Sequence, residues 1–267
     1  MLPKLWAFFK RDWQLASALQ FNFLFGLLRT VASLVSFFFI GKLFLGGWTP
    51  PSLAAYGGDY FRFVFLGLAF SGLVTTALGS MKQTIGFELG SGTLEAILLT
   101  PTPLTVLMVE KVLWDLALLL GKIAIYFLIG ILLFRIDFSQ ANWAAAFLVF
   151  ILTTVAFLGL GIFSAGFFLL TKGATPVDLI FDWGSRFLAG VYFPTVILPG
   201  WLQRVSAYLP LTYTLEAIRK CVIGGASLAA IQKELMVLLG FALILFPGSF
   251  FFFNWAFDQS RRRGNFF

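Results

Sequence analysis

Residues 87–103, FELGSGTLEAILLTPTP, lie between two long apolar runs and are too few and too polar to cross a membrane themselves. Ser91 is a favourable N-cap, and the carboxylate of Glu95 falls in the first turn, where it stabilises the positive end of the helix dipole. Pro101 disfavours a helical conformation at the residue before it. These signals predict a helix over residues 91–100, about 15 Å long, which is half the thickness of a membrane core.

One face of this predicted helix is apolar. Leu94, Ile97 and Leu98 repeat at the i, i+3, i+4 spacing of a helical stripe, whereas Thr93 and Glu95 are polar. Periodicity alone favours an amphipathic turn that lies on the lipid headgroups.

The composition around this segment is that of an integral membrane protein. Of the 267 residues, 60% are hydrophobic and only 12% are charged, which is more apolar surface than a soluble domain could bury. The formal charge is +7, but the basic residues are spread along the chain and partly flank apolar runs, so they indicate membrane topology rather than nucleic-acid binding. There is no His and a single Cys, Cys221, which excludes an internal disulfide, a zinc site and a Cys–His nucleophile. We therefore expect no catalytic residues and no metal site.

The apolar runs predict an all-α membrane domain that occupies residues 1–267 and contains six transmembrane helices. The predicted spans are residues 21–45, 60–81, 104–134, 143–170, 177–198 and 235–257. Residues 2–20 are amphipathic, basic and rich in aromatic side chains, as in a helix that lies in the interface. Residues 199–225 are broken by Pro210 into two short helices, too short to span. An even number of spans places both termini on one side, and the basic N-terminal helix and the three Arg at 261–263 indicate that this side is the cytoplasm.

Ionisable groups are costly at membrane depth, and the charged residues expected there are Arg29, Lys122, Asp182 and Arg186. Glu110, Lys111 and Asp115 crowd the first turns of the span 104–134, which are expected to project into the cytoplasm or the headgroups. Asp182 and Arg186 are spaced i, i+4 and can neutralise each other, which makes them either a self-paired stabiliser or part of a substrate path. Arg29 and Lys122 have no obvious partner nearby in the sequence, and either could pair with a carboxylate on another span.

Two groups of residues carry a resemblance to a known family. The first is Glu88 with GTLE at 92–95, Leu98 and TP at 100–101; the second is GVYFP at 190–194, LPGW at 198–201, LPLTY at 209–213 and EAIR at 216–219. With their order among six spans, these residues resemble the membrane subunits of type 2 ABC exporters, over essentially the whole chain.

The resemblance implies roles for several segments. Residues 91–100 would be the coupling helix, which docks in a groove of a separate ATPase, and residues 2–20 would be the connecting helix on the membrane surface. The implied docking residues are Glu88, Ser91, Thr93, Leu94, Glu95, Ile97 and Leu98. Residues 199–225 would form short re-entrant helices that cap the exit on the outer side. The implied cap residues are Tyr192, Phe193, Pro194, Pro199, Trp201, Pro210, Tyr213, Glu216 and Arg219.

The chain has no phosphate-binding loop of the GxxxxGK[ST] type, because Lys42 and Lys122 follow glycine but are followed by Leu and Ile. The resemblance therefore implies that ATP and Mg²⁺ bind to two copies of a partner ATPase. Since six spans are half of such a transporter, it also implies a second permease chain, as in a homodimer. The expected cargo is amphipathic or hydrophobic: a lipid, a drug or natural product, or a lipid-linked glycan. It would leave through the cell (inner) membrane.

Two other classes remain as alternatives. A stand-alone secondary carrier needs no ATPase but usually shows a repeat with paired broken helices, which this sequence lacks. A membrane-embedded assembly factor or enzyme needs polar catalytic residues clustered at one depth, and Asp182 with Arg186 is too small a set. Within the ABC class, the absence of His argues against a haem-handling permease.

Overall fold

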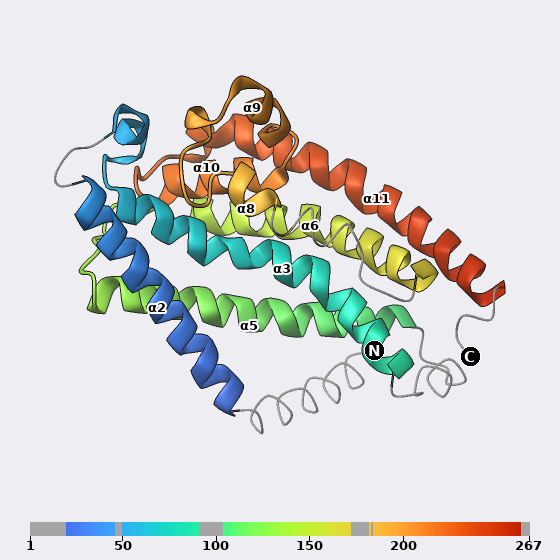
Figure 1. Cartoon of the computed structure of the whole chain (residues 1–267). Coiled ribbons are helices and arrows are strands. Elements are labelled where there is room, and N and C mark those ends of the chain that lie inside the picture. The colour runs from blue at the N-terminus through green and yellow to red at the C-terminus, as the bar shows by residue number, and fades with distance from the viewer. Residues whose placement is uncertain (1–19, 46–49, 91–103, 172–181, 183, 263–267) are drawn as a thin grey trace.

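The computed structural model describes residues 20–45, 50–90, 104–171, 182 and 184–262, and every regular element in these ranges is a helix (Figure 1). The long helices are α2 (Gln20–Leu45), α3 (Tyr60–Gly90), α5 (Leu104–Leu132), α6 (Trp143–Thr171) and α11 (Gln232–Arg262). Among the described residues, four helical segments are long and apolar enough to cross a membrane: Tyr60–Glu88, Lys111–Leu132, Trp143–Thr171 and Leu228–Arg262. The described part of the chain is thus all-helical, with four helices that could cross a membrane rather than the six predicted spans.

Short helices occupy the connections between the long ones. They are η1 (Pro51–Tyr56), α8 (Ser185–Leu188), η3 (Thr195–Ile197), α9 (Gly200–Ser206), α10 (Pro210–Val222) and η4 (Leu228–Ile231). Residues 190–226, which we call the cap, contain α9 and α10 and lie at the end of the bundle where α3 and α11 begin (Figure 1). Asn142, in the connection between α5 and α6, bonds the carbonyls of Cys221 and Ala226, so this connection lies at the same end as the cap.

Several boundaries differ from the predicted ones. α3 continues nine residues past the expected end at Met81, because Lys82 ends the apolar run but does not end the helix. Of the predicted span 177–198, residues 177–181 and 183 lie outside the described part. The described remainder is α-helical only to Leu188, since Gly190 adopts a left-handed φ of 84° and Pro194 precedes a separate 3₁₀ turn. The predicted helix at 91–100 also lies outside the described residues, as does the predicted helix at 2–20 except for Gln20, which is the first residue of α2.

α6 is the central helix of one half of the bundle, with α3 on one side and α11 on the other. Glycines on α6 allow this close approach: a Cβ at Gly161 would collide with the carbonyl oxygen of Ala77 on α3, and one at Gly159 would lie 2.8 Å from the backbone of Leu245 on α11. Small residues at such contacts are typical of helices that pack within a membrane.

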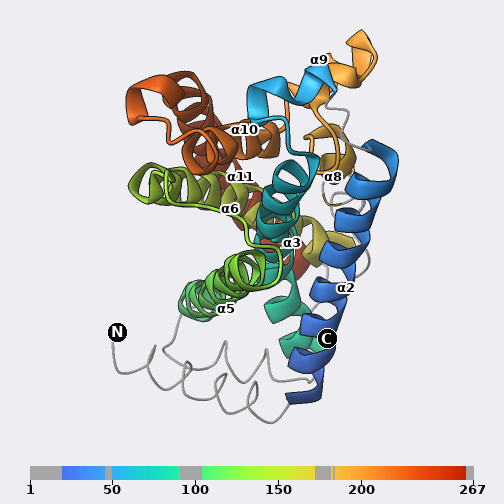
Figure 2. The ribbon, with the colours of Figure 1, turned by 90° about the vertical axis from the view of Figure 1, so that its left-hand side faces the viewer.

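Aromatic side chains fill the bundle near the cap. Phe61, Phe63 and Phe65 of α3 are buried there, and the ring of Phe127 on α5 packs edge-on against Trp143 at 5.1 Å. Much of the Phe-rich composition therefore serves packing between helices. α3 also has α2 and α5 on either side of it (Figure 2). This arrangement leaves a space beside α3 that holds the candidate site.

Candidate functional site

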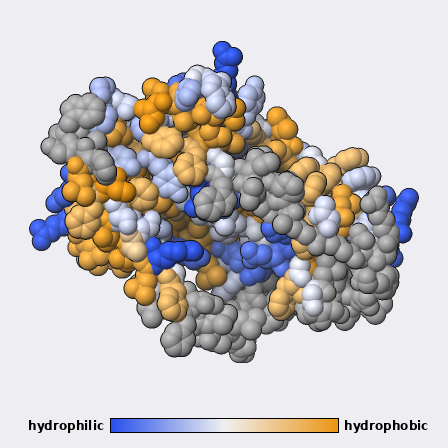
Figure 3. Space-filling view, viewed as in Figure 1, coloured by the Kyte–Doolittle hydropathy of each residue, from blue (hydrophilic) through white to orange (hydrophobic). Residues whose placement is uncertain are grey.

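A cavity of about 370 Å³ lies beside the middle of α3, between α2, α5 and the start of α8. Its polar lining consists of Arg29, Thr30, Ser71, Thr75, Thr76, Lys122, Tyr126 and Arg186. Figure 3 shows hydrophilic side chains gathered near the middle of this face, where α3 and α5 lie, with hydrophobic side chains on both sides. The cavity is thus a polar site within an apolar bundle.

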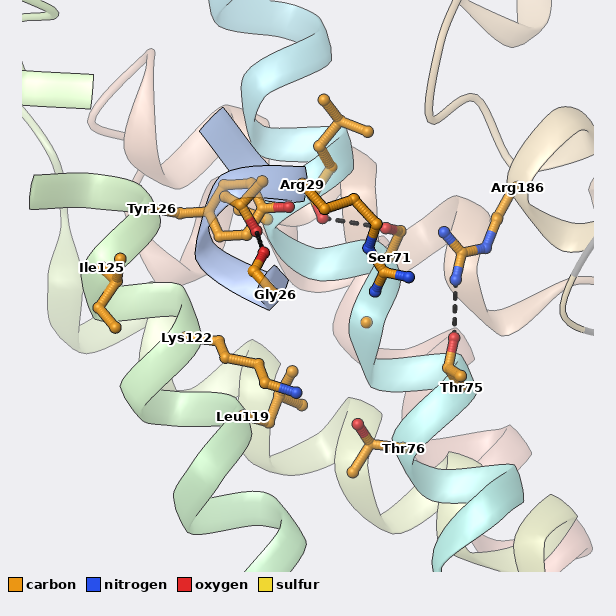
Figure 4. Close-up of a pocket in the computed structure, with 14 residues that line it drawn as sticks. Gly26, Arg29, Ser71, Thr75, Thr76, Leu119, Lys122, Ile125, Tyr126 and Arg186 are labelled. Carbon is orange, nitrogen blue, oxygen red and sulfur yellow. Dashed lines mark hydrogen bonds between the residues drawn. The ribbon is translucent and has the colours of Figure 1, made fainter. Parts of the chain in front are cut away.

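The three basic residues of the cavity come from three different helices. Arg29 belongs to α2, Lys122 to α5 and Arg186 to α8, and the close-up in Figure 4 shows all three side chains beside α3. Thr75 is the middle residue of α3, about 22 Å from either end of that helix. Lys122 lies about 15 Å before the last residue of α5. The charges therefore meet midway along the bundle, at the depth where they are most costly in a membrane.

Arg186 is held by a network with Asp182 and Thr75. Its Nη2 lies 3.1 Å from Oδ1 of Asp182 and donates to the Thr75 hydroxyl at 2.7 Å, and its Nε also donates to Asp182 at 3.2 Å. The Thr75 hydroxyl in turn donates to the same carboxylate oxygen at 2.7 Å. The ion pair expected from the i, i+4 spacing therefore forms, and it is tied to α3. One of the three cavity cations is neutralised in this way.

Arg29 and Lys122 have no carboxylate partner among the described residues. Asp115, the nearest acidic residue before Lys122 in the sequence, pairs instead with Lys111 at 2.9 Å. The carboxylate on another span that could have paired with either residue is not found within the described ranges. Both side chains line the cavity, and neither is neutralised there by a described carboxylate.

The hydroxyl groups of the cavity were not singled out from the sequence. Thr75 follows Ser71 by four residues on α3, and Tyr126 follows Lys122 by four on α5, so each pair shares one helix face. Polar residues at this spacing in an apolar helix are the signal that could have identified them.

At the cap, Arg219 on α10 is the most deeply buried charge. Its guanidinium donates to the carbonyls of Phe63 at 3.1 Å and Gly190 at 2.8 Å, with Val191 at 3.5 Å, and it stacks on the Phe63 ring at 3.4 Å. Gly67 makes room for this contact, since a Cβ there would collide with the Val191 carbonyl. Burial lowers the pKa of Arg219 to about 9, which still leaves it protonated at neutral pH. Arg219 joins the cap to α3.

The other cap residues named from the sequence have mixed environments. Tyr192 stacks on Phe37 of α2 at 5.5 Å, and the Tyr213 hydroxyl donates to the Ala207 carbonyl at 3.1 Å. Glu216 lies 3.3 Å from the ammonium of Lys220. Pro210 is the first residue of α10, whereas Pro199 and Pro194 directly precede α9 and η3. Phe193 is half-buried and Trp201 is exposed. The cap is therefore anchored by α10 and open to its surroundings at α9.

The structure says little about the predicted docking residues. Ser91, Thr93, Leu94, Glu95, Ile97 and Leu98 lie outside the described residues. Glu88 lies near the end of α3 and is 5% exposed, which leaves little of its side chain for a partner in this conformation.

The cavity is suited to non-covalent binding. Its lining offers cations, hydroxyls and apolar groups, and in the described part of the chain no three His, Cys, Asp or Glu side chains come close enough together to hold a metal ion. These side chains can bind a polar group by charge and hydrogen bonds.

Comparison with known proteins agrees with this picture. The sequence matches the family described as "ABC-2 type transporter" over residues 3–223. It is also similar to proteins named "Inner membrane transport permease YadH" from Escherichia coli K12, Escherichia coli O157:H7 and Shigella flexneri. The identity is 23% over 212 residues in each case, which covers 78% of this chain and 78% of each relative. Since the family match extends over most of the chain, this protein belongs to the ABC-2 type transporter family.

Proposed function

We propose that this chain is the membrane subunit of an ATP-driven exporter, which moves an amphipathic compound out of the cytoplasm or the inner leaflet. The observation that carries the proposal is a charged cavity midway along a bundle of membrane helices, in a chain of the ABC-2 type transporter family. The chain lacks a phosphate-binding loop, so the ATPase is a separate subunit that binds ATP and Mg²⁺.

An amphipathic cargo is supported by the surroundings of the cavity. Exposed apolar side chains lie one helical turn from the basic residues of the cavity: Phe25 precedes Arg29 by four residues on α2, and Leu118 precedes Lys122 by four on α5. A polar group could occupy the cavity while its apolar part lies along these helices, in contact with lipid. A lipid, a drug or natural product and a lipid-linked glycan share this property.

The proposed assembly contains two copies of this chain and two ATPases in the inner membrane, the location given in the YadH name. Each chain would contribute six spans, with both termini in the cytoplasm and the cap on the outer side. The alternation of the described helices supports this topology, because α2 and α5 end near the cap while α3, α6 and α11 begin there (Figure 1). Residues 91–100, next to the end of α3 away from the cap, then dock on the ATPase.

The test is co-purification of an ATPase with the tagged chain from membranes of its native host, followed by measurement of ATP hydrolysis. We expect a co-purifying subunit with a phosphate-binding loop, and its loss in the double variant Ile97→Glu, Leu98→Glu, since apolar anchors dominate the energy of protein interfaces. The control is Leu228→Glu with Ala229→Glu, two exposed apolar residues of η4 at the cap end.

Two results would contradict the proposal. Transport by the purified chain alone would make it a secondary carrier, and an ATPase that stays bound to the Ile97, Leu98 double variant would remove the docking assignment.

A further inference from the structure

We propose that the cavity between α2, α3 and α5 binds the phosphate-type headgroup of an anionic amphiphile. This inference rests on the proposed export function and assigns the chemical class of its cargo. It starts from the charge of the cavity. Arg29, Lys122 and Arg186 line it, and Asp182 neutralises only Arg186, so two positive charges face the cavity without a carboxylate among the described residues.

This excess of positive charge in the cavity favours the binding of an anion. An ionised side chain midway through a membrane is costly unless a partner of opposite charge compensates it. Arg29 and Lys122 belong to different helices, yet both line one cavity rather than separate faces of the bundle (Figure 4). An anion bound between them would compensate both charges at once, which neither helix can do alone.

The hydroxyl groups of the cavity add hydrogen-bond donors for such an anion. Thr30 and Ser71 already donate to carbonyls of their own helices, and Thr75 donates to Asp182. Thr76 and Tyr126 donate to no group in the described part of the chain, which leaves their hydroxyls available. Phosphate oxygens accept several such bonds at once, and charge-assisted bonds to Arg and Lys are among the strongest in proteins.

The size and borders of the cavity favour a headgroup over a whole molecule. Its volume of about 370 Å³ is near the lower limit of small-molecule sites, which span roughly 300–1,000 Å³. The remainder of an amphiphile must then lie outside it, against exposed apolar residues of the flanking helices such as Phe25 and Leu118, each one helical turn from a basic residue of the cavity. A soluble anion would make no use of that apolar border.

The test measures lipid binding to the purified chain by native mass spectrometry, without any ATPase. Phosphatidylglycerol and phosphatidylcholine with the same acyl chains are compared, because they share the phosphodiester and differ in net charge. We expect phosphatidylglycerol to bind about tenfold more tightly or better, and we expect Arg29→Gln with Lys122→Gln to abolish this preference. Lys42→Gln with Arg204→Gln is the matched control, since it also removes two positive charges, and both residues lie outside the cavity.

Equal affinity for the two lipids, or a preference that survives in the double variant, overturns the proposal. Inorganic pyrophosphate serves as a competitor: displacement of the lipid by pyrophosphate at equal concentration would show that a soluble anion is the ligand and would also overturn it. The labelling rate of the buried Cys221 thiol, compared between the wild type and the double variant, shows that the variant is folded. Because no ATPase takes part, failure here leaves the export function standing, and failure of ATPase co-purification leaves this binding result standing.

Discussion

Replacing Arg219 by Met should loosen the cap from α3, and the protein carries its own reporter for this change. The Arg219 guanidinium bonds the carbonyls of Phe63 on α3 and Gly190 in the cap. Cys221, the single cysteine of the chain, is fully buried two residues further along α10. A maleimide can reach this buried thiol only when the cap opens, and burial also raises the pKa of the thiol to about 11, which lowers its reactivity while the cap is closed.

The size of the effect follows from the contacts of Arg219. The Gly190 carbonyl loses its bond at 2.8 Å and stays buried, whereas the Phe63 carbonyl retains its partner in the ladder of α3. A hydrogen bond to a charged group contributes about 1.5–3 kcal/mol, and a desolvated cation–π contact about 2 kcal/mol. The cost of burying the guanidinium offsets part of this sum. We expect a net loss of about 2–4 kcal/mol, which corresponds to labelling of Cys221 about 30- to 700-fold faster.

The measurement is the rate of maleimide labelling of Cys221 in detergent at 25 °C. Arg204→Met is the control, because Arg204 is exposed on α9, and it should leave the rate unchanged. Arg219→Lys should give an intermediate rate, since one ammonium cannot reach both carbonyls as the guanidinium fork does. A rate within about threefold of wild type in Arg219→Met, equivalent to less than about 0.7 kcal/mol, would refute the assigned role.

Two further changes test the packing of the bundle and the cap by thermal unfolding followed through circular dichroism. Gly161→Ala should lower the free energy of unfolding by about 1–3 kcal/mol, because the added Cβ forces α3 away from α6. Gly121→Ala is the control, since Gly121 has open space around it, and it should be neutral or slightly stabilising. Equal unfolding temperatures for the two variants would contradict the packing argument. Lys220→Met removes the 2.7 Å bond to the buried carboxylate of Glu234 and should lower the free energy of unfolding by about 1–2 kcal/mol. Lys233→Met, at an exposed site, should change it by less than about 0.5 kcal/mol. Similar losses in both variants would show that the Lys220–Glu234 pair contributes nothing to stability.

The long helices are the part of the fold that hydropathy could predict, because each contains enough consecutive apolar residues to dominate its own conformation. Their ends were less predictable. Lys82 marks where α3 ceases to be apolar, yet the helix persists to Gly90, since a charged residue ends a lipid-facing stretch without interrupting backbone hydrogen bonds. Conversely, the apolar run continues to Leu198, but the helix α8 ends at Leu188. It ends there because Gly190 and Pro194 impose backbone angles that a hydropathy scale does not take into account.

The sequence allowed the charged residues of the candidate site to be predicted, but not that they line one cavity. Arg29 and Lys122 stand out in the sequence as isolated cations in apolar runs, but nothing local shows that α2 and α5 bring them to one cavity. The opposite holds for Asp182 and Arg186, whose pairing is a property of one helix turn and could be read directly. Arg219 belongs to neither case: its sequence surroundings resemble a family signature, while its partners Phe63 and Gly190 come from distant parts of the chain.

The short helix α8 connects the cavity to the cap, because it is attached to α3 at two points. At the cavity, Arg186 bonds Thr75; at the cap, the turn that follows α8 bonds Arg219, which also bonds Phe63. Thr75 and Phe63 lie twelve residues apart on α3, about 18 Å along its axis. The Arg186 attachment is partly exposed and therefore contributes little, whereas the Arg219 attachment is buried and costly to break. Any movement that widens the cavity between α3 and α8 will thus separate Arg186 from Thr75 first, with the cap still fixed to α3.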